Sequence, residues 1–160
     1  MRTSHVLLGA CAVALAGCQA KRAEAAFDPK DPAALAAIDS LMKPTIRGAQ
    51  AANADQVLKI AEGPAPFTFL SGDEMLTGLP KIHDAFAKTY QHVKRQDQEI
   101  LEHEVRLVAP DVALYTAVGE GTYTTPSGWT SHPTGLGLTV VLVKHDGRWQ
   151  AVHAHQSIAP

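Results

Sequence analysis

Apolar residues recur at helical spacing between residues 35 and 60 of the chain. Asp31-Pro32 is typical of a helix start, with the aspartate as the N-cap and the proline at the first helical position. The apolar face is made of Leu35, Ile38, Leu41, Met42, Ile46, Val57, Leu58 and Ile60. Pro44 falls in the same register and is expected to kink or restart the helix, and a break at Gly48 or Asn53 is also expected. The helical region ends at Gly63-Pro64-Ala65-Pro66.

A second amphipathic helix follows Leu79-Pro80. Its apolar face contains Ile82, Phe86, Tyr90 and Val93, and the pattern predicts an end near Gln96. The segment 67–70 before it is short and aromatic-rich, which favours a strand, and 75–78 is expected to pair back on it.

After Gln96 the period of the pattern changes to two. Alternating residues predict a strand over 101–107 and, after a Pro-Asp turn, a second strand over 112–123. A loop over 124–134 leads to another hairpin, 136–144 and 149–157, closed by the Asp146-Gly147 turn. Helices followed by a meander of long strands predict an α+β domain whose helices cover one face of a curved antiparallel sheet.

The N-terminus differs from the rest of the chain. An apolar run, 6–15, follows Arg2 and His5, and it is too short to anchor in a bilayer, which favours a secretion signal over 1–17. The following Leu15-Ala16-Gly17-Cys18 resembles the lipobox of bacterial lipoprotein precursors. That resemblance implies lipidation of Cys18 and a place in the cell envelope, anchored to the membrane and facing the periplasm or extracytoplasmic space. The alternative is a chance tetrapeptide in an alanine-rich stretch.

Removal of the signal would leave a charged tether over 18–30 and one domain over 31–160. Cys11 would leave with the signal and Cys18 would be acylated, so no disulfide is expected in the mature domain. The charge is nearly balanced, with 14 Lys+Arg against 16 Asp+Glu, which excludes the strongly basic surface of a nucleic-acid-binding protein.

The last hairpin carries a resemblance to a known family. Its strand ends in Lys144, turns at Gly147, continues with Trp149 and closes with His153-x-His155-x-Ser157. This pattern resembles the nuclear transport factor 2-like superfamily, above all its SnoaL-like members and the association domain of calcium/calmodulin-dependent kinases. Upstream, Gly78-x-x-x-Ile82 and 109–113 match the rhythm of the same superfamily.

The resemblance implies a cone, in which a strongly bent sheet wraps on three helices and leaves an open pocket, and assembly as a homodimer through the sheet. It implies no single reaction, because members include isomerases, cyclases, dehydratases and assembly modules. The Asp-Tyr-Asp group of the ketosteroid isomerases finds no counterpart here. The pocket arginines of the kinase association domain correspond to Val140 and Gln156, which favours a mostly apolar pocket.

Three residues are candidates for acid/base catalysis: His155, His103 and Glu120. Glu120 stands between two glycines, and the interpretation favoured is a solvent-facing residue at a strand bend, with a pocket carboxylate as the alternative. Alternation places His153 and His155 on one strand face together with Trp149 and Ser157. Two imidazoles are too few for an ordinary zinc site, so neither a metal nor a cofactor is predicted.

Aromatic side chains are the candidates for ligand binding. The proposed set is Phe69, Phe86, Tyr90, Tyr115 and Trp129. Trp129 lies in a Gly/Pro-rich loop, where an indole is typical of a pocket lid or a partner contact. The sequence thus favours an envelope-tethered domain that binds a small apolar molecule. The alternatives are a SnoaL-like isomerase, cyclase or dehydratase with a histidine base, and a non-catalytic oligomerisation module.

Overall fold

The computed structural model describes residues 26–159. The predicted signal peptide, Cys18 and the tether up to residue 25 lie outside the described residues. The elements follow in the order α1 (Pro32–Gln50), α2 (Ala54–Leu58), the 3-10 helix η1 (Lys59–Ala61), β1 (Thr68–Ser71), β2 (Glu74–Thr77), α3 (Leu79–Tyr90), β3 (Arg95–Ala109), β4 (Val112–Thr124), β5 (Thr134–His145) and β6 (Arg148–Ile158). None of the helices in the described part is long and apolar enough to cross a membrane.

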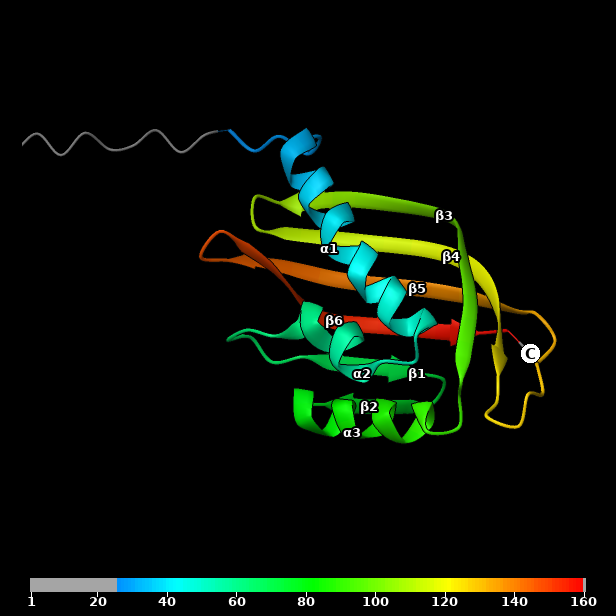
Figure 1. Ribbon diagram of the computed structural model, residues 1–160. Coiled ribbons are helices and arrows are strands. Elements are labelled where there is room, and N and C mark those ends of the chain that lie inside the picture. The colour runs from blue at the N-terminus through cyan, green and yellow to red at the C-terminus, as the bar shows by residue number, and fades with distance from the viewer. Residues whose placement is uncertain (1–25, 160) are drawn as a thin grey trace, which may run out of the picture.

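All strands belong to one six-stranded sheet with the order β2-β1-β6-β5-β4-β3. Every neighbouring pair is antiparallel except β1 and β6, which run parallel. In Figure 1, α1 crosses one face of the sheet diagonally, α3 lies along β1 and β2, and β3 and β4 bend sharply at one end. The predicted α+β fold, a curved sheet covered by three helices on one face, is confirmed.

The helix starts follow from local chemistry. The carboxylate of Asp31 accepts a hydrogen bond from the Ala33 amide at 2.9 Å and thereby caps α1, as predicted. Asn53 caps α2 in the same way, with its side-chain oxygen 3.0 Å from the Gln56 amide. Pro44 neither ends α1 nor restarts it, because the helix continues to Gln50. The break falls instead at 51–53, where Ala52 adopts a left-handed conformation.

The end of α3 differs from the prediction. The helix ends at Tyr90 rather than near Gln96, and β3 already begins at Arg95. The Lys94 amide donates to the Thr124 carbonyl at 2.7 Å, so β4 captures the chain before another helical turn can form. A tertiary hydrogen bond therefore overrides the helical spacing of Val93.

The core lies between the helices and the inner face of the sheet, which is the face that α1 covers. Ile38, Met42, Ile82 and Leu142 are its fully buried large side chains. Burying each such side chain contributes about 1.5–3 kcal/mol. The middle of the cone is therefore packed, and the spaces that remain lie toward its two ends.

Candidate functional site

The pairing register separates the two faces of the sheet. Tyr115 and Ala117 are buried under α1, and they pair with Val140 and Leu138 on β5, so these four residues face inward. Val140 pairs in turn with Ala154 on β6. The residues between them point to the opposite, outer face.

His155 and Glu120 lie on that outer face. His155 pairs with Thr139 of β5 and is exposed, and Glu120 is exposed on β4, paired with Gly135. Thr139 and Gly135 are four residues apart on β5, so the structure does not bring His155 and Glu120 together. A Cβ on Gly119 would lie 2.3 Å from the Glu99 carbonyl oxygen, which places Glu120 beside a close approach of β3 and β4.

A β-bulge corrects the predicted face of Trp149. Leu142 pairs with Ala151 while Val141 pairs with His153, so β6 carries one extra residue at this point. Trp149 packs against the core with Ala151, whereas His153 and His155 point outward. The placement of Trp149 with the two histidines is therefore wrong, because the extra residue reverses the alternation.

His103 lies on the inner face, beside α1. Its Nε2 atom is 3.2 Å from Oδ1 of Asp39, and its ring stacks on Tyr115 with a centroid distance of 5.4 Å. Burial and, to a smaller extent, the charge of Asp39 raise the pKa of Tyr115 above its ordinary value. A carboxylate that orients an imidazole is an arrangement able to accept a proton from a neighbouring molecule. The pair is about half exposed, with 45% of the histidine and 42% of the aspartate side chain open to solvent.

Three of the five aromatic candidates come together at one end of the cone. We call this the open end; it is where β6 finishes, β3 begins and α3 meets the sheet. Phe69 packs edge-on against Phe86 at 4.9 Å between ring centroids, and Phe86 packs edge-on against Tyr90 at 5.7 Å. Burial raises the pKa of Tyr90 to about 12, against a smaller lowering by its hydrogen bond with Gln96. The Tyr90 hydroxyl is therefore a neutral donor at physiological pH.

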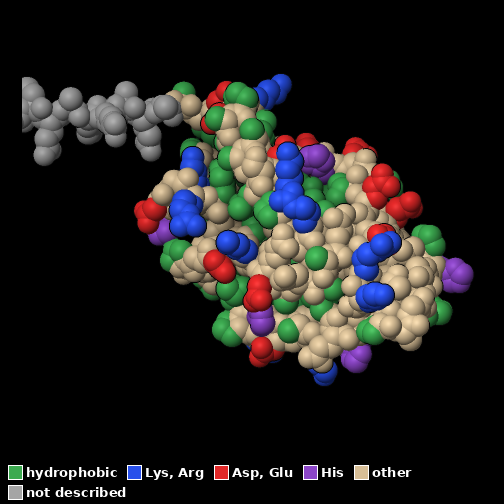
Figure 2. Space-filling model, viewed as in Figure 1, with side chains coloured by type: hydrophobic (Ala, Val, Ile, Leu, Met, Phe, Trp, Pro, Cys, Tyr) green, Lys and Arg blue, Asp and Glu red, His purple; other side chains and the backbone are tan. Residues whose placement is uncertain are grey.

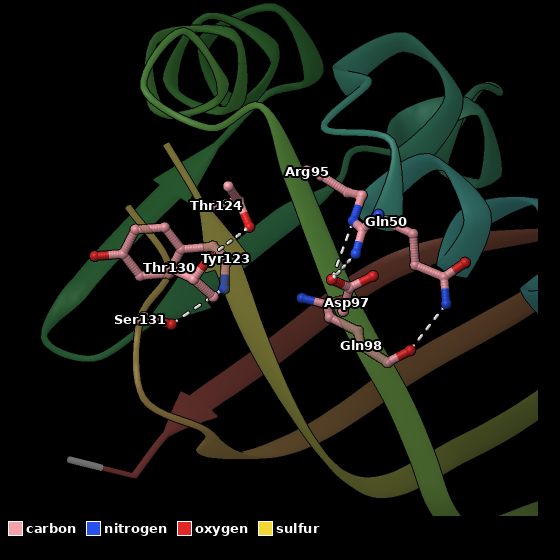
Figure 3. Close-up of polar contacts among 8 residues, drawn as sticks. All are labelled: Gln50, Arg95, Asp97, Gln98, Tyr123, Thr124, Thr130 and Ser131. Carbon is pink, nitrogen blue, oxygen red and sulfur yellow. Dashed lines mark hydrogen bonds and ion pairs between the residues drawn. The ribbon is translucent and has the colours of Figure 1, made fainter. Parts of the chain in front are cut away.

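Glutamine side chains tie α1 to β3 at the open end. The Gln50 amide donates to the Gln98 carbonyl oxygen at 2.8 Å, and the Gln96 amide donates to the Ala49 carbonyl oxygen at 2.8 Å (Figure 3 shows the first contact). Gln98 donates to the side chain of Gln96 at 3.0 Å. These amides are half-buried and offer both donors and acceptors next to the aromatic rings.

The other two aromatic candidates lie elsewhere. Tyr115 is 2% exposed and belongs to the packed core. Trp129 is 55% exposed in the β4–β5 connection, where its ring packs edge-on against Tyr123 at 5.7 Å. The connection is held by hydrogen bonds between Thr124 and Thr130 and from the Tyr123 amide to Ser131, both visible in Figure 3.

The described residues form surface hollows at both ends of the cone. One, of about 490 Å³, lies at the open end between the start of α2 and α3; it is lined by Asn53, Asp55, His83, Ala87, Tyr90 and Gln91, with the alanines 51, 52 and 54. The other, of about 440 Å³, lies at the opposite end, beside the β5–β6 turn. Tyr90 therefore belongs both to the aromatic group and to the lining of the first hollow.

Comparison with known proteins settles the family. The sequence profile of the SnoaL-like domain matches residues 38–160. The chain belongs to the SnoaL-like domain family. Among curated proteins, none matches the chain.

Several solved structures are similar in fold to this SnoaL-like domain. A protein with a cystatin-like fold from Caulobacter vibrioides shares 23% identity at a TM-score of 0.66, covering 78% of this chain and 89% of its own. A nuclear transport factor 2-like superfamily protein from Salmonella enterica shares 16% identity at 0.70, covering 81% and 93%. A ketosteroid isomerase-like protein from Erwinia carotovora shares 19% identity at 0.65, covering 79% and 96%. At these identities the likeness establishes the fold alone.

Two acidic residues that contact histidines in this SnoaL-like domain, Asp39 and Asp55, were not predicted from the sequence. Asp39 lies one turn from Leu35 and Met42 on α1. An acidic residue at the border of an apolar helix face is therefore the sequence signal that could have identified it. Asp55 lies 3.0 Å from Nε2 of His83 across the first hollow, and no local pattern links residues on two different helices. Within residues 26–159, no group of three or more His, Cys, Asp or Glu side chains is placed to hold a metal ion.

Proposed function

We propose that this SnoaL-like domain binds a small, largely apolar molecule at the open end of its cone. The observation that carries the proposal is the edge-to-face run of Phe69, Phe86 and Tyr90 beside a hollow of about 490 Å³. Small-molecule sites combine apolar walls with a few fixed polar groups. The Tyr90 hydroxyl and the amides of Gln96 and Gln98 supply such groups here.

The ligand class follows from the same groups. A neutral phenol and carboxamides recognise carbonyl or hydroxyl groups without requiring a charge. Aromatic rings packed edge-to-face present both ring edges and ring faces to a ligand, and these surfaces suit alicyclic and aromatic ligands. Sterol-like and polyketide-like compounds, with apolar rings and few oxygens, fit this description.

Thermal-shift screening with such compounds tests the proposal. We expect at least one compound to raise the melting temperature of the wild type by binding the folded state. Phe86→Leu and Tyr90→Phe should each reduce that rise, because they change the ring wall and the hydroxyl, while Lys94→Gln serves as a surface control. If no compound stabilises the wild type, or if both variants respond like the wild type, the proposal fails.

A second candidate function rests on His103. This imidazole is oriented by Asp39 on the same inner face of the sheet, which supports a proton-transfer role. A compound that binds would then be converted on incubation, and mass spectrometry would detect the product. His103→Gln and Asp39→Asn should both abolish conversion while binding persists. Conversion that survives His103→Gln would remove this candidate.

The proposed location is the cell envelope, through a lipid on Cys18. The signal-like N-terminus of the sequence supports this part of the proposal, and two or three acyl chains would hold the domain firmly at a membrane. Cys18→Ser should move the protein from the membrane fraction to the soluble fraction. If that variant still sediments with membranes and the wild type carries no lipid mass, the envelope assignment fails.

A homodimer through the outer face of the sheet completes the proposal. Val118 is 50% exposed on this face, and Leu114 and Val141 are half-buried beside it. Exposed apolar positions on a sheet face suit self-complementary pairing about a two-fold axis. Sedimentation should give a dimer for the wild type and a shift toward monomer for Val118→Glu. A pure monomer at micromolar concentration would contradict it.

A further inference from the structure

We propose that the connection between β4 and β5 docks on a lipid bilayer, so that the open end of the cone faces the membrane. This inference rests on the proposed envelope location and on the proposed ligand site. The pairing register places the connection at the open end, because Thr124 at the end of β4 pairs with Arg95, where β3 begins. Leu136 near the start of β5 pairs with Ile158, where β6 finishes. The connection therefore forms part of the rim of the open end (Figure 1).

Three large apolar side chains are exposed at this rim. Trp129 is 55% exposed, Tyr123 is 41% exposed and Ile158 is 58% exposed. The rings of Trp129 and Tyr123 pack edge-on at 5.7 Å between centroids. Tryptophan and tyrosine favour the membrane–water boundary, where the ring contacts acyl chains and its polar atom stays in water. Exposed apolar side chains at one end of a domain are typical of an interaction surface.

The connection itself carries no formal charge. Residues 121–143 contain no Asp, Glu, Lys or Arg, and the histidine among them is His132. Lys94 lies next to the connection, with its amide 2.7 Å from the Thr124 carbonyl oxygen, and a lysine at this place can extend toward lipid phosphates. Figure 2 shows mainly hydrophobic and uncharged surface at the lower right, where the connection lies in Figure 1. Contact with lipid therefore dehydrates few charged groups here.

The acidic side chains of β3 and β4 lie back from the rim. Asp97 is held by Arg95, whose Nε atom is 3.0 Å from Oδ2 of the aspartate. Glu99 and Glu120 pair with each other across the two strands, three positions before Tyr123, which is about 10 Å away. Interfacial side chains insert about 5–10 Å into the boundary between headgroups and acyl chains. These carboxylates therefore stay in water when the rings insert.

The backbone of the connection is hydrogen-bonded within the protein. The Thr125 amide donates to the Trp129 carbonyl oxygen at 2.8 Å, and the Gly128 amide donates to the Thr125 carbonyl oxygen at 3.0 Å. The Ser131 amide donates to the Tyr123 carbonyl oxygen at 3.0 Å. Unpaired backbone groups are what make an irregular loop unfavourable in lipid. The loop can therefore hold the Trp129 indole at the bilayer boundary without leaving these groups unpaired.

The length of the N-terminal tether permits this orientation. Helix α1 leads from Pro32 to Gln50, and Gln50 contacts β3 at the open end. At about 1.5 Å per residue, the helix spans about 28 Å. The chain between Cys18 and Pro32 can span at most about 45 Å. A lipid on Cys18 and the rim of the open end can therefore reach the same membrane surface, and the rim would supply the second contact with the membrane.

Two tryptophans at opposite ends of the sheet make the orientation measurable. Trp149→Phe leaves Trp129 as the only tryptophan, and Trp129→Phe leaves Trp149 beside the β5–β6 turn, at what we call the turn end. Both variants are made in the full-length Cys18→Ser chain. An N-terminal hexahistidine tag attaches them to phosphatidylcholine vesicles with a nickel-chelating lipid, so the result does not depend on acylation. The Trp129 emission should shift to shorter wavelength and be quenched by brominated acyl chains, while the Trp149 emission should stay unchanged.

Serine substitutions test the apolar contact. Tyr123→Ser and Ile158→Ser should each reduce the quenching of Trp129, because each removes apolar surface from the rim. Met75→Ser is the matched control, since Met75 is 66% exposed on β2, an edge strand far from β4 in the sheet order, and should leave the quenching unchanged. Unquenched Trp129, equal quenching of both tryptophans, or an equal effect of all three serine variants would overturn the inference. So would a Trp129 shift that needs only more protein and no vesicles, because it would indicate contact between copies.

Failure of docking is distinguishable from failure of the proposed function. Thermal-shift measurements without vesicles report ligand binding alone. A compound that stabilises the protein while Trp129 stays unquenched on vesicles would overturn the docking inference and leave the ligand site standing. Quenching of Trp129 without any stabilising compound would support docking and contradict the ligand site.

Discussion

The two ends of the sheet are closed in different ways. At the open end, side chains from four elements pack or hydrogen-bond together: rings from β1 and α3, and glutamines from α1 and β3, all half-buried. At the turn end, one fully buried glutamine, Gln150, holds the loop between η1 and β1. An end of the sheet that is held by several half-exposed side chains can adapt to a ligand. An end that is held by one buried amide is rigid and sensitive to substitution.

Substitution in the packed middle should have the largest effect, since both ends depend on it. Leu142→Ala removes a side chain that is 0% exposed, and the resulting cavity should cost about 2–5 kcal/mol of unfolding free energy. Urea unfolding followed by circular dichroism measures this loss. Leu101→Ala, which truncates a leucine that is 59% exposed on β3, is the matched control with a much smaller cost, and equal losses would show that the middle is not the packed core described here.

The next largest losses of stability are expected for the glutamines that hold the two ends of the sheet, and the two losses should differ. Gln150→Leu leaves the Ala61 and Ala65 carbonyl groups without their donor, at a cost of about 1–3 kcal/mol. Gln50→Leu removes a half-buried hydrogen bond to Gln98, where water can replace the lost donor, at a cost of about 0.5–1.5 kcal/mol. If urea unfolding gives Gln50→Leu the larger cost, the contrast between a rigid and an adaptable end is wrong.

Alkaline pH should weaken the open end through Tyr90. Its folded-state pKa is raised from 10.0 to about 12, so between those values the unfolded chain loses the phenolic proton first. Stability is therefore fully present below pH 10 and falls as pH rises toward 12. Unfolding free energies at several pH values should show this slope in the wild type and a reduced slope in Tyr90→Phe. An identical slope in the variant would mean that Tyr90 is not buried as described.

The smallest effect is expected for the surface pair at the start of β3. Nε of Arg95 lies 3.0 Å from Oδ2 of Asp97, and both side chains are more than half exposed (Figure 3). Exposed ion pairs contribute about 0–1 kcal/mol. Arg95→Ala should therefore leave the urea midpoint nearly unchanged, and a large loss would indicate a role in holding the open end together.

Local signals were enough to predict most elements of the fold. The Asp31 cap and the Asp146-Gly147 turn act through neighbouring backbone groups, and both residues of the turn have positive φ angles, as a tight hairpin requires. The end of α3 was missed because a hydrogen bond from Lys94 to Thr124, 30 residues away, stops the helix. No periodicity within α3 contains that information.

The candidate site was less accessible to sequence reasoning. Phe69, Phe86 and Tyr90 were chosen as aromatic residues, and their meeting depends on how α3 lies against β1. The bulge in β6 adds one residue between Ala151 and His153, and a two-residue period has no means of showing such an insertion. The contact between Asp39 and His103 joins residues 64 positions apart on α1 and β3. These errors arise from tertiary packing, which sets the faces and partners of the strands.

The most direct test of the central claim is a map of where a stabilising compound binds. NMR spectra of the ring protons, recorded with and without a compound that raises the melting temperature, would locate it. We expect the shifted resonances to belong to Phe69, Phe86 and Tyr90 at the open end. Shifts confined to outer-face residues such as His155, with the three rings unchanged, would contradict it.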